Sequence, residues 1–121
     1  MGVVLALIVA VGTTIVPPPI PNDAVVLVDL FKECKSGHVY KRLLDTDRNG
    51  RPDIATFGRV RAASKGPQLE DPLMTIYYDQ TKTGLEQLRD VYLTFPGKAV
   101  ERIVPSELFR RYQTTCGLID P

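Results

Sequence analysis

The sequence contains no tryptophan and a single histidine, His38. That histidine has no serine, cysteine or aspartate partner in a known pattern of a nucleophilic active site. The chain also lacks a glycine-rich phosphate loop and the residue spacings that bind haem or zinc. We therefore expect a protein that is not an enzyme.

The sequence has little excess of charge of either sign. Lys and Arg together number 15 and Asp and Glu 14, which gives a formal net charge of +1. The stretch 35–65 is locally basic, but it lacks the interleaved aromatic side chains that stack on bases. We interpret this stretch as a solvated face and expect no nucleic-acid partner.

Charged side chains are absent from the first 22 residues. Nine consecutive apolar residues, Val3–Val11, stand there ahead of the proline-rich stretch 17–21. A helix needs about 20 apolar residues to cross a bilayer, so no stable membrane span is expected. We distinguish an apolar N-terminal segment, 1–16, from a proline linker, 17–23.

Two fates of the apolar segment stay open. Ala10-Val11-Gly12 gives the small-x-small pattern of a signal-peptide cleavage site, although no Lys or Arg precedes it. Alternatively the segment is retained as a strand, because it is rich in Val and Ile. Such a strand needs cover on both faces, within its own fold or in a neighbouring copy. The residues expected to form this assembly strand are Val3, Leu5, Leu7, Val9 and Val11.

A chain of 121 residues has room for one domain. Gly, Pro and Asp separate five segments that are expected to be strands, at 24–31, 38–44, 54–61, 73–78 and 91–95. A helix is expected to start at Ser106 as N-cap and to run through Tyr112. We predict a mainly β fold over 24–121, a small antiparallel β-sandwich or barrel-like domain. A short C-terminal helix and an extended apolar N-terminal strand complete it.

The sequence has two cysteines, Cys34 and Cys116, which match neither a C-x-x-C redox pair nor a zinc spacing. In a secreted chain they are expected to form a disulfide. Closing a loop of roughly 80 residues would stabilise the fold by about 4 to 5 kcal/mol in the chain-entropy model. The alternative is two buried free thiols in a cytosolic protein.

Oxygen-bearing side chains alternate along the segment 45–53, Asp-Thr-Asp-Arg-Asn-Gly-Arg-Pro-Asp. Oxygens at positions 1, 3, 5 and 9, with a glycine at position 6 for the turn, suit a hard cation that takes six to eight oxygen ligands. The segment resembles the EF-hand-like calcium loops of secreted and cell-surface proteins, such as dockerins and thrombospondin type 3 repeats. That resemblance implies calcium as the cofactor, held by four side chains and the backbone carbonyl of Arg51: Asp45, Asp47, Asn49, Arg51 and Asp53.

The segment departs from an EF-hand in two positions. Thr56 stands at position 12, where an EF-hand sensor has a bidentate Glu, and Pro52 stands at position 8. The flanking residues favour strands over helices, so we expect a weak calcium loop at a hairpin tip, with an affinity of roughly 10⁻⁴ to 10⁻³ M. A turn stabilised by Asp and Asn without any metal is the alternative. The stretch 79–84 repeats the pattern with hydroxyls in place of acids, as either a degenerate second copy or a coincidence.

Two functions agree with these features. The first is a structural subunit of an extracellular filament, which polymerises by inserting its N-terminal strand into the neighbouring subunit and is stabilised by one calcium loop. Its general plan is similar to that of donor-strand pili, with another copy of the chain as partner. The alternative is a secreted monomeric calcium-binding module whose signal peptide is cleaved.

Overall fold

The computed structural model describes residues 15–35, 37–82 and 87–111. The expected assembly strand lies outside these residues, and so do Cys116 and the end of the expected helix at Tyr112. Cys34 is disulfide-bonded. Since the only other cysteine of the sequence lies outside the described residues, the pairing Cys34–Cys116 stays a prediction.

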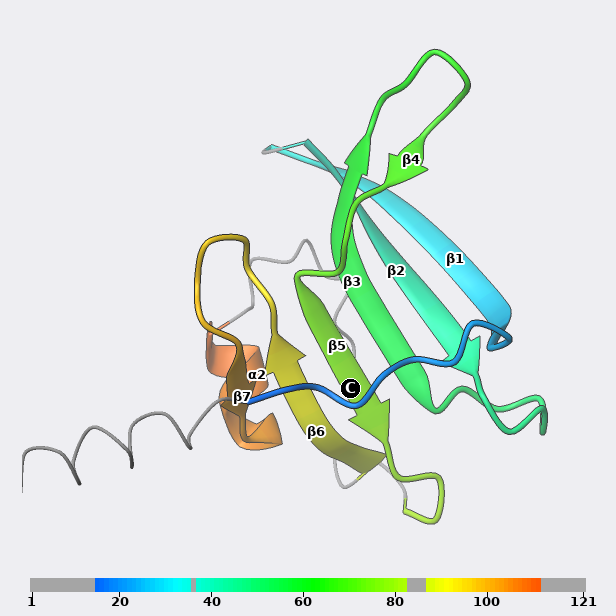
Figure 1. Ribbon diagram of the computed structural model, residues 1–121, viewed down its shortest axis with the longest axis vertical. Coiled ribbons are helices and arrows are strands. Elements are labelled where there is room, and N and C mark those ends of the chain that lie inside the picture. The colour runs from blue at the N-terminus through cyan, green and yellow to red at the C-terminus, as the bar shows by residue number, and fades with distance from the viewer. Residues whose placement is uncertain (1–14, 36, 83–86, 112–121) are drawn as a thin grey trace, which may run out of the picture.

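The described strands form one open antiparallel sheet (Figure 1). In chain order they are β1 (Val25–Cys34), β2 (Gly37–Asp45), β3 (Ile54–Arg61), β4 (Gln68–Leu69), β5 (Met74–Tyr78), β6 (Leu88–Leu93) and β7 (Glu101–Ile103). The order across the sheet is β1-β2-β3-β5-β6-β7, and β4 pairs with the C-terminal end of β3. A helix, α2 (Pro105–Arg111), follows the last strand. The prediction of a mainly β, antiparallel domain with a short C-terminal helix is therefore confirmed. In place of the expected sandwich or barrel-like arrangement, the described strands form a single sheet that does not close.

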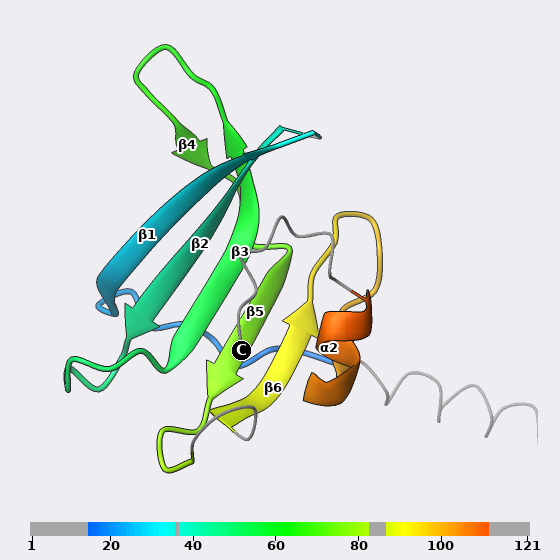
Figure 2. The ribbon, with the colours of Figure 1, turned by 180° about the vertical axis from the view of Figure 1, so that it is seen from behind.

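Alternation along the strands gives the sheet two faces of different composition. The larger apolar cluster lies on the face that α2 covers (Figure 2), and Leu108 of that helix is fully buried in it. Its other buried members come from β3, β5, β6 and β7: Ala55, Phe57, Met74, Ile76, Leu88, Val91, Leu93 and Ile103. The helix packs mainly against β6 and leaves the β1 side of this face uncovered (Figure 2).

The opposite face carries a smaller cluster of Leu44, Ile54, Tyr77 and Tyr92. Residues 15–24, here named the proline strap, cross this face from the β7 side to the start of β1 (Figure 1). The hydroxyl of Tyr77 donates a hydrogen bond of 2.5 Å to the carbonyl of Pro18. The stretch expected to be a linker therefore packs on the domain and covers part of its sheet.

Three elements differ from the sequence-based expectations. Strands β4 and β7 were not predicted, because two or three residues give too short a pattern to recognise. The helix begins at Pro105, so the prediction of Ser106 as N-cap is wrong. Proline suits the first helical position because its fixed φ is helical and its missing N–H would have had no partner there. Among the described residues, no helix is long and apolar enough to cross a membrane.

Candidate metal site

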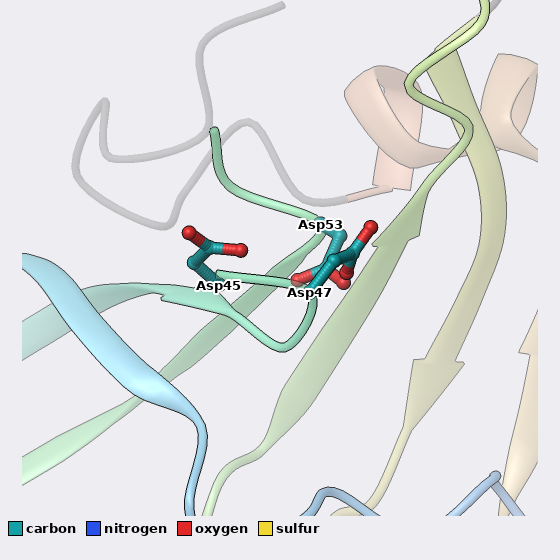
Figure 3. Close-up of side chains that lie close together, drawn as sticks. All are labelled: Asp45, Asp47 and Asp53. Carbon is teal, nitrogen blue, oxygen red and sulfur yellow. The ribbon is translucent and has the colours of Figure 1, made fainter. Parts of the chain in front are cut away.

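The β2–β3 hairpin carries the acidic loop at its tip. Asp45 is the last residue of β2, and Asp53 immediately precedes β3. The N–H of Asp53 donates to the carbonyl of Leu44 at 2.9 Å and closes the loop. Carboxylate oxygens of Asp45, Asp47 and Asp53 all lie within 4.8 Å of one another (Figure 3). Three of the predicted ligands therefore come together at one place.

Asp45 organises the backbone of the loop. Its side chain is almost fully buried, with 2% of its surface exposed. One carboxylate oxygen accepts from the N–H groups of Arg48 at 2.9 Å and Asn49 at 3.4 Å, and the other accepts from the N–H of Gly50 at 2.7 Å. Both oxygens thus compensate for burial by hydrogen bonding to the turn. Asp45 would hold the loop in shape whether or not a cation is bound.

The carboxylates of Asp47 and Asp53 lie close together (Figure 3), and Thr46 contacts both of them. The backbone N–H of Thr46 donates to Asp53 Oδ1 at 3.0 Å. The hydroxyl of Thr46 lies within hydrogen-bonding distance of Asp53 Oδ2 and, at 2.9 Å, of Asp47 Oδ1. A hydroxyl has one proton to donate, so it can satisfy only one of these carboxylates at a time.

The pKa values of these two carboxyl groups are displaced in opposite directions. Burial raises the pKa of Asp53, but hydrogen bonds from Thr46 and Asp47 outweigh burial, and the net pKa is lowered. The pKa of Asp47 is raised, and the main cause is its hydrogen bond with Asp53. A proton shared by two adjacent carboxylates offsets their mutual repulsion. A divalent cation at the same point would offset that repulsion at neutral pH.

The other two predicted ligands are held by a residue that the sequence did not single out, Gln80. The amide N–H of Asn49 donates to Gln80 Oε1 at 2.8 Å, and Asn49 Oδ1 accepts from the N–H of Arg51 at 3.0 Å. The amide of Gln80 in turn donates to the carbonyls of Arg51 at 3.0 Å and Pro52 at 3.3 Å. Asn49 and Arg51 would have to share or exchange these bonds in order to bind a cation.

Gln80 belongs to the 79–84 loop, which the sequence leaves open as either a degenerate second copy of the acidic loop or a coincidence. There the carboxylate of Asp79 accepts from the N–H of Thr81 at 3.0 Å and from its hydroxyl at 2.6 Å. These bonds lower the pKa of Asp79. Thr83, at position 5 of that pattern, lies outside the described residues. The structure thus gives the second loop a clear role as the support of the first.

The site is open to solvent and suited to a hard cation. Asp47 and Asp53 line an open pocket of about 480 Å³ between the two loops and the proline strap, together with Asp79 and Arg89. Ca²⁺ and Mg²⁺ prefer carboxylate and carbonyl oxygens, and Asp47 and Asp53 present carboxylates here beside that of Asp45. The arrangement could therefore hold one such ion, with water completing its coordination.

Comparison with protein-family models, with curated proteins and with solved structures finds no match to this chain.

Proposed function

We propose that this chain is a structural subunit of an extracellular filament, self-associating and stabilised by a calcium ion at the 45–53 loop. The observation that carries the proposal is strand β1, an edge strand of the described sheet with large exposed apolar side chains between Val25 and Phe31. They are Val25, Val26, Val28, Leu30 and Phe31, each at least 37% exposed. A long apolar edge strand invites pairing with another chain.

The N-terminal sequence supports the same proposal. The run Val3–Val11 also needs cover, and a strand with two apolar faces is stable in water only inside an assembly or a core. One chain therefore has both an apolar segment that needs a partner and an apolar edge that can accept one. The acidic loop would add a rigid, cation-stabilised hairpin to each subunit.

The test is the state of the full chain after purification under oxidising conditions. Sedimentation velocity and negative-stain electron microscopy are expected to find polymers that grow with protein concentration in millimolar calcium. A single species of 13.4 kDa at all concentrations up to about 0.1 mM would contradict self-association.

The second candidate is a secreted monomer that binds calcium, and the cluster of Asp45, Asp47 and Asp53 favours it. In this function the N-terminal segment is a signal peptide and β1 remains a free edge. N-terminal sequencing of the protein isolated from its source separates the candidates. A native chain that begins near Thr13 supports the monomer, and a retained Val3–Val11 run supports the filament.

A further inference from the structure

We infer that the C-terminal segment 112–121 docks on the face of the sheet that carries α2, where it covers Ala55 and Phe57 of β3 and is anchored by a disulfide between Cys116 and Cys34. The segment, here named the tail, lies outside the described residues. Its docking site, here named the tail site, is the surface above Ala55 and Phe57. The inference goes beyond the proposed function, because it concerns contacts within one chain.

Ala55 and Phe57 are more deeply buried than their described neighbours explain. They are 0% and 5% exposed. Helix α2 lies on their face but packs mainly against β6, which is separated from β3 by β5. Lys41 reaches over the ring of Phe57, with its Nζ 5.6 Å from the ring centroid. Figure 2 shows no described helix or strand other than α2 over this face, so we look for a further cover outside the described residues.

Of the stretches outside the described residues, the tail is the one that starts on the correct face. It continues directly from α2. Residues 1–14 lead into the proline strap, which crosses the opposite face (Figure 1). Residues 83–86 follow the end of β5, whereas Phe57 lies opposite Met74 at the start of that strand. The tail is therefore the occupant that the fold favours for the tail site.

The side chain of Cys34 lies on the same face as the tail site. Strand β1 alternates without a register shift from Leu30 to Cys34, so these two side chains share a face. Leu30 lies opposite Lys41, and Lys41 lies opposite Phe57. Cys34 is disulfide-bonded, and Cys116 in the tail is the only other cysteine of the sequence. A bond between the two would thus hold the tail on the face where α2 ends.

The reach of the chain fixes the route of the tail. Four strand spacings of about 4.8 Å separate β6, on which α2 packs, from β1, a distance of roughly 19 Å. Five residue steps from Arg111 to Cys116 span at most about 18 Å. A disulfide adds up to about 7 Å between its α-carbons. The tail can therefore reach Cys34 directly across this face, but it is too short to pass round the β7 edge and across the opposite face.

The composition of the tail suits a buried position. Residues 112–119 contain no charged side chain, and Leu118 and Ile119 follow Cys116 closely. Phe57 is two strand spacings across and four residues along from Cys34, roughly 16 Å away. The disulfide and three further residues reach up to about 18 Å. Leu118 and Ile119 can therefore extend back from Cys34 to the tail site.

The first measurement maps the disulfide in the unmodified full chain, purified under oxidising conditions. Trypsin should release two peptides that remain joined without reductant, Glu33–Lys35 and Tyr112–Pro121. Mass spectrometry identifies the pair, and non-reducing denaturing electrophoresis should show a band of monomer mass. A disulfide between the Cys34 residues of two chains would overturn the inference.

The second measurement locates the tail with a photo-crosslinking amino acid at position 118 of the full chain. In the oxidised protein it should label residues 55–57 of β3. The product should run at monomer mass in reducing denaturing electrophoresis, because the crosslink joins two parts of one chain. Crosslinks to Tyr77 or Tyr92 on the opposite face, or to a second chain, would overturn the inference.

The third measurement tests the cover with a tail variant that carries Leu118→Asp and Ile119→Asp. It should bind the dye ANS and melt at a lower temperature than the unmodified chain, because Phe57 loses its cover. The matched control carries Ile15→Asp and Val16→Asp, which change two adjacent apolar residues that are already 40% and 75% exposed. The control should behave like the unmodified chain.

If the tail variant and the control behave alike, the tail does not cover the tail site and the inference is wrong. If the tail variant does not fold, the disulfide map and the crosslinks decide, since neither requires it. The proposed function can fail separately. A chain that stays monomeric but gives the expected peptide pair and crosslinks would disprove self-association and leave this inference intact.

Discussion

The ring of Tyr40 lies directly over the α-carbon of Gly58 on the neighbouring strand. The two residues are opposite one another in the β2–β3 pairing. A Cβ atom added to Gly58 would lie 2.6 Å from the Cε2 atom of the tyrosine ring. The hydroxyl of Tyr40 donates a hydrogen bond of 2.8 Å to the carbonyl of Glu70. The missing side chain of Gly58 thus lets Tyr40 reach across β3 to the segment that follows β4.

Gly58→Ala is expected to destabilise the fold, by about 1 to 3 kcal/mol in the unfolding free energy. In an ordinary strand position this substitution is stabilising, because glycine weakens strands. Here the added methyl must displace the tyrosine ring and break its bond to Glu70. Urea unfolding of the two proteins measures the difference.

A double-mutant cycle with Tyr40→Ala provides the control. In the absence of the ring, Gly58→Ala should be neutral or stabilising, because nothing then occupies the space above residue 58. Equal destabilisation in both backgrounds would mean that the contact with Tyr40 is not the cause.

The β2–β3 hairpin was the part of the fold most accessible from the sequence. Its predicted arms, 38–44 and 54–61, agree with the observed strands Gly37–Asp45 and Ile54–Arg61. Two long runs that contain Val, Tyr, Ile, Thr and Phe on either side of a turn-forming loop leave few alternatives. The role of Gly58 was hidden, since it depends on which residue lies across from it.

Calcium is expected to raise the melting temperature of the chain, and Asp47→Asn is expected to abolish the increase. Binding to the folded state alone contributes about 2.7 kcal/mol at a hundredfold excess over the dissociation constant. Asp47 is the informative position because it is exposed, whereas Asp45 supports the loop backbone in the absence of any ion. Differential scanning fluorimetry at 0 to 10 mM calcium gives the readout.

Asp71→Asn is the matched control, because it removes one exposed carboxylate outside the acidic loop. It should leave the calcium response unchanged. An identical response in the Asp47→Asn and unmodified proteins, or no response to calcium in either, would contradict a cation site at Asp45, Asp47 and Asp53.

The contributions of Asp53 and Asp47 to folding stability change with pH in opposite directions. Asp53 has a lowered pKa, so its ionised form stabilises the fold above the unfolded-state value of about 3.9. That contribution is lost as the pH falls through the folded-state pKa. Asp47 has a raised pKa, so its contribution is present at low pH and is lost as the pH rises through its folded-state value. Carboxyl ¹³C NMR titration should find Asp47 titrating above Asp53.

Thr46→Val should raise the pKa of Asp53, because the hydroxyl hydrogen bond that favours its ionised form is removed. Thr81→Val makes the equivalent change in the second loop and should raise the pKa of Asp79 only. If Thr46→Val left the pKa of Asp53 unchanged, the hydrogen bond from Thr46 would not be the cause of the lowered pKa.

Thiol titration of the oxidised protein is expected to find no free cysteine, and reduction is expected to destabilise it. In the chain-entropy model, a bond that joins Cys34 to Cys116 contributes about 4 to 5 kcal/mol. Chemical denaturation with and without reductant measures this difference, with a Cys34→Ser, Cys116→Ser variant as reference. Two titratable thiols in protein from its source would indicate a reducing compartment instead.

The acidic loop was only partly predictable. The spacing of Asp45, Asp47 and Asp53 is local, and the structure brings their oxygens together as that spacing suggests. Gln80 was missed because its contacts with Asn49 and Arg51 span 31 and 29 residues, and a single glutamine carries no pattern. The path of the proline strap was missed for the same reason. Its contact with Tyr77 depends on which face of the sheet remains uncovered once α2 has packed.

The order of strands in the sheet also bears on how the chain folds. Almost every strand pairs with the one that precedes it, so most loops to be closed during folding are short and lose little entropy. The strap makes a much longer connection, since its bond from Tyr77 to Pro18 joins residues 59 positions apart. The meander is therefore expected to form first and the strap to dock late. Substitutions in the strap would then accelerate unfolding and leave the folding rate almost unchanged.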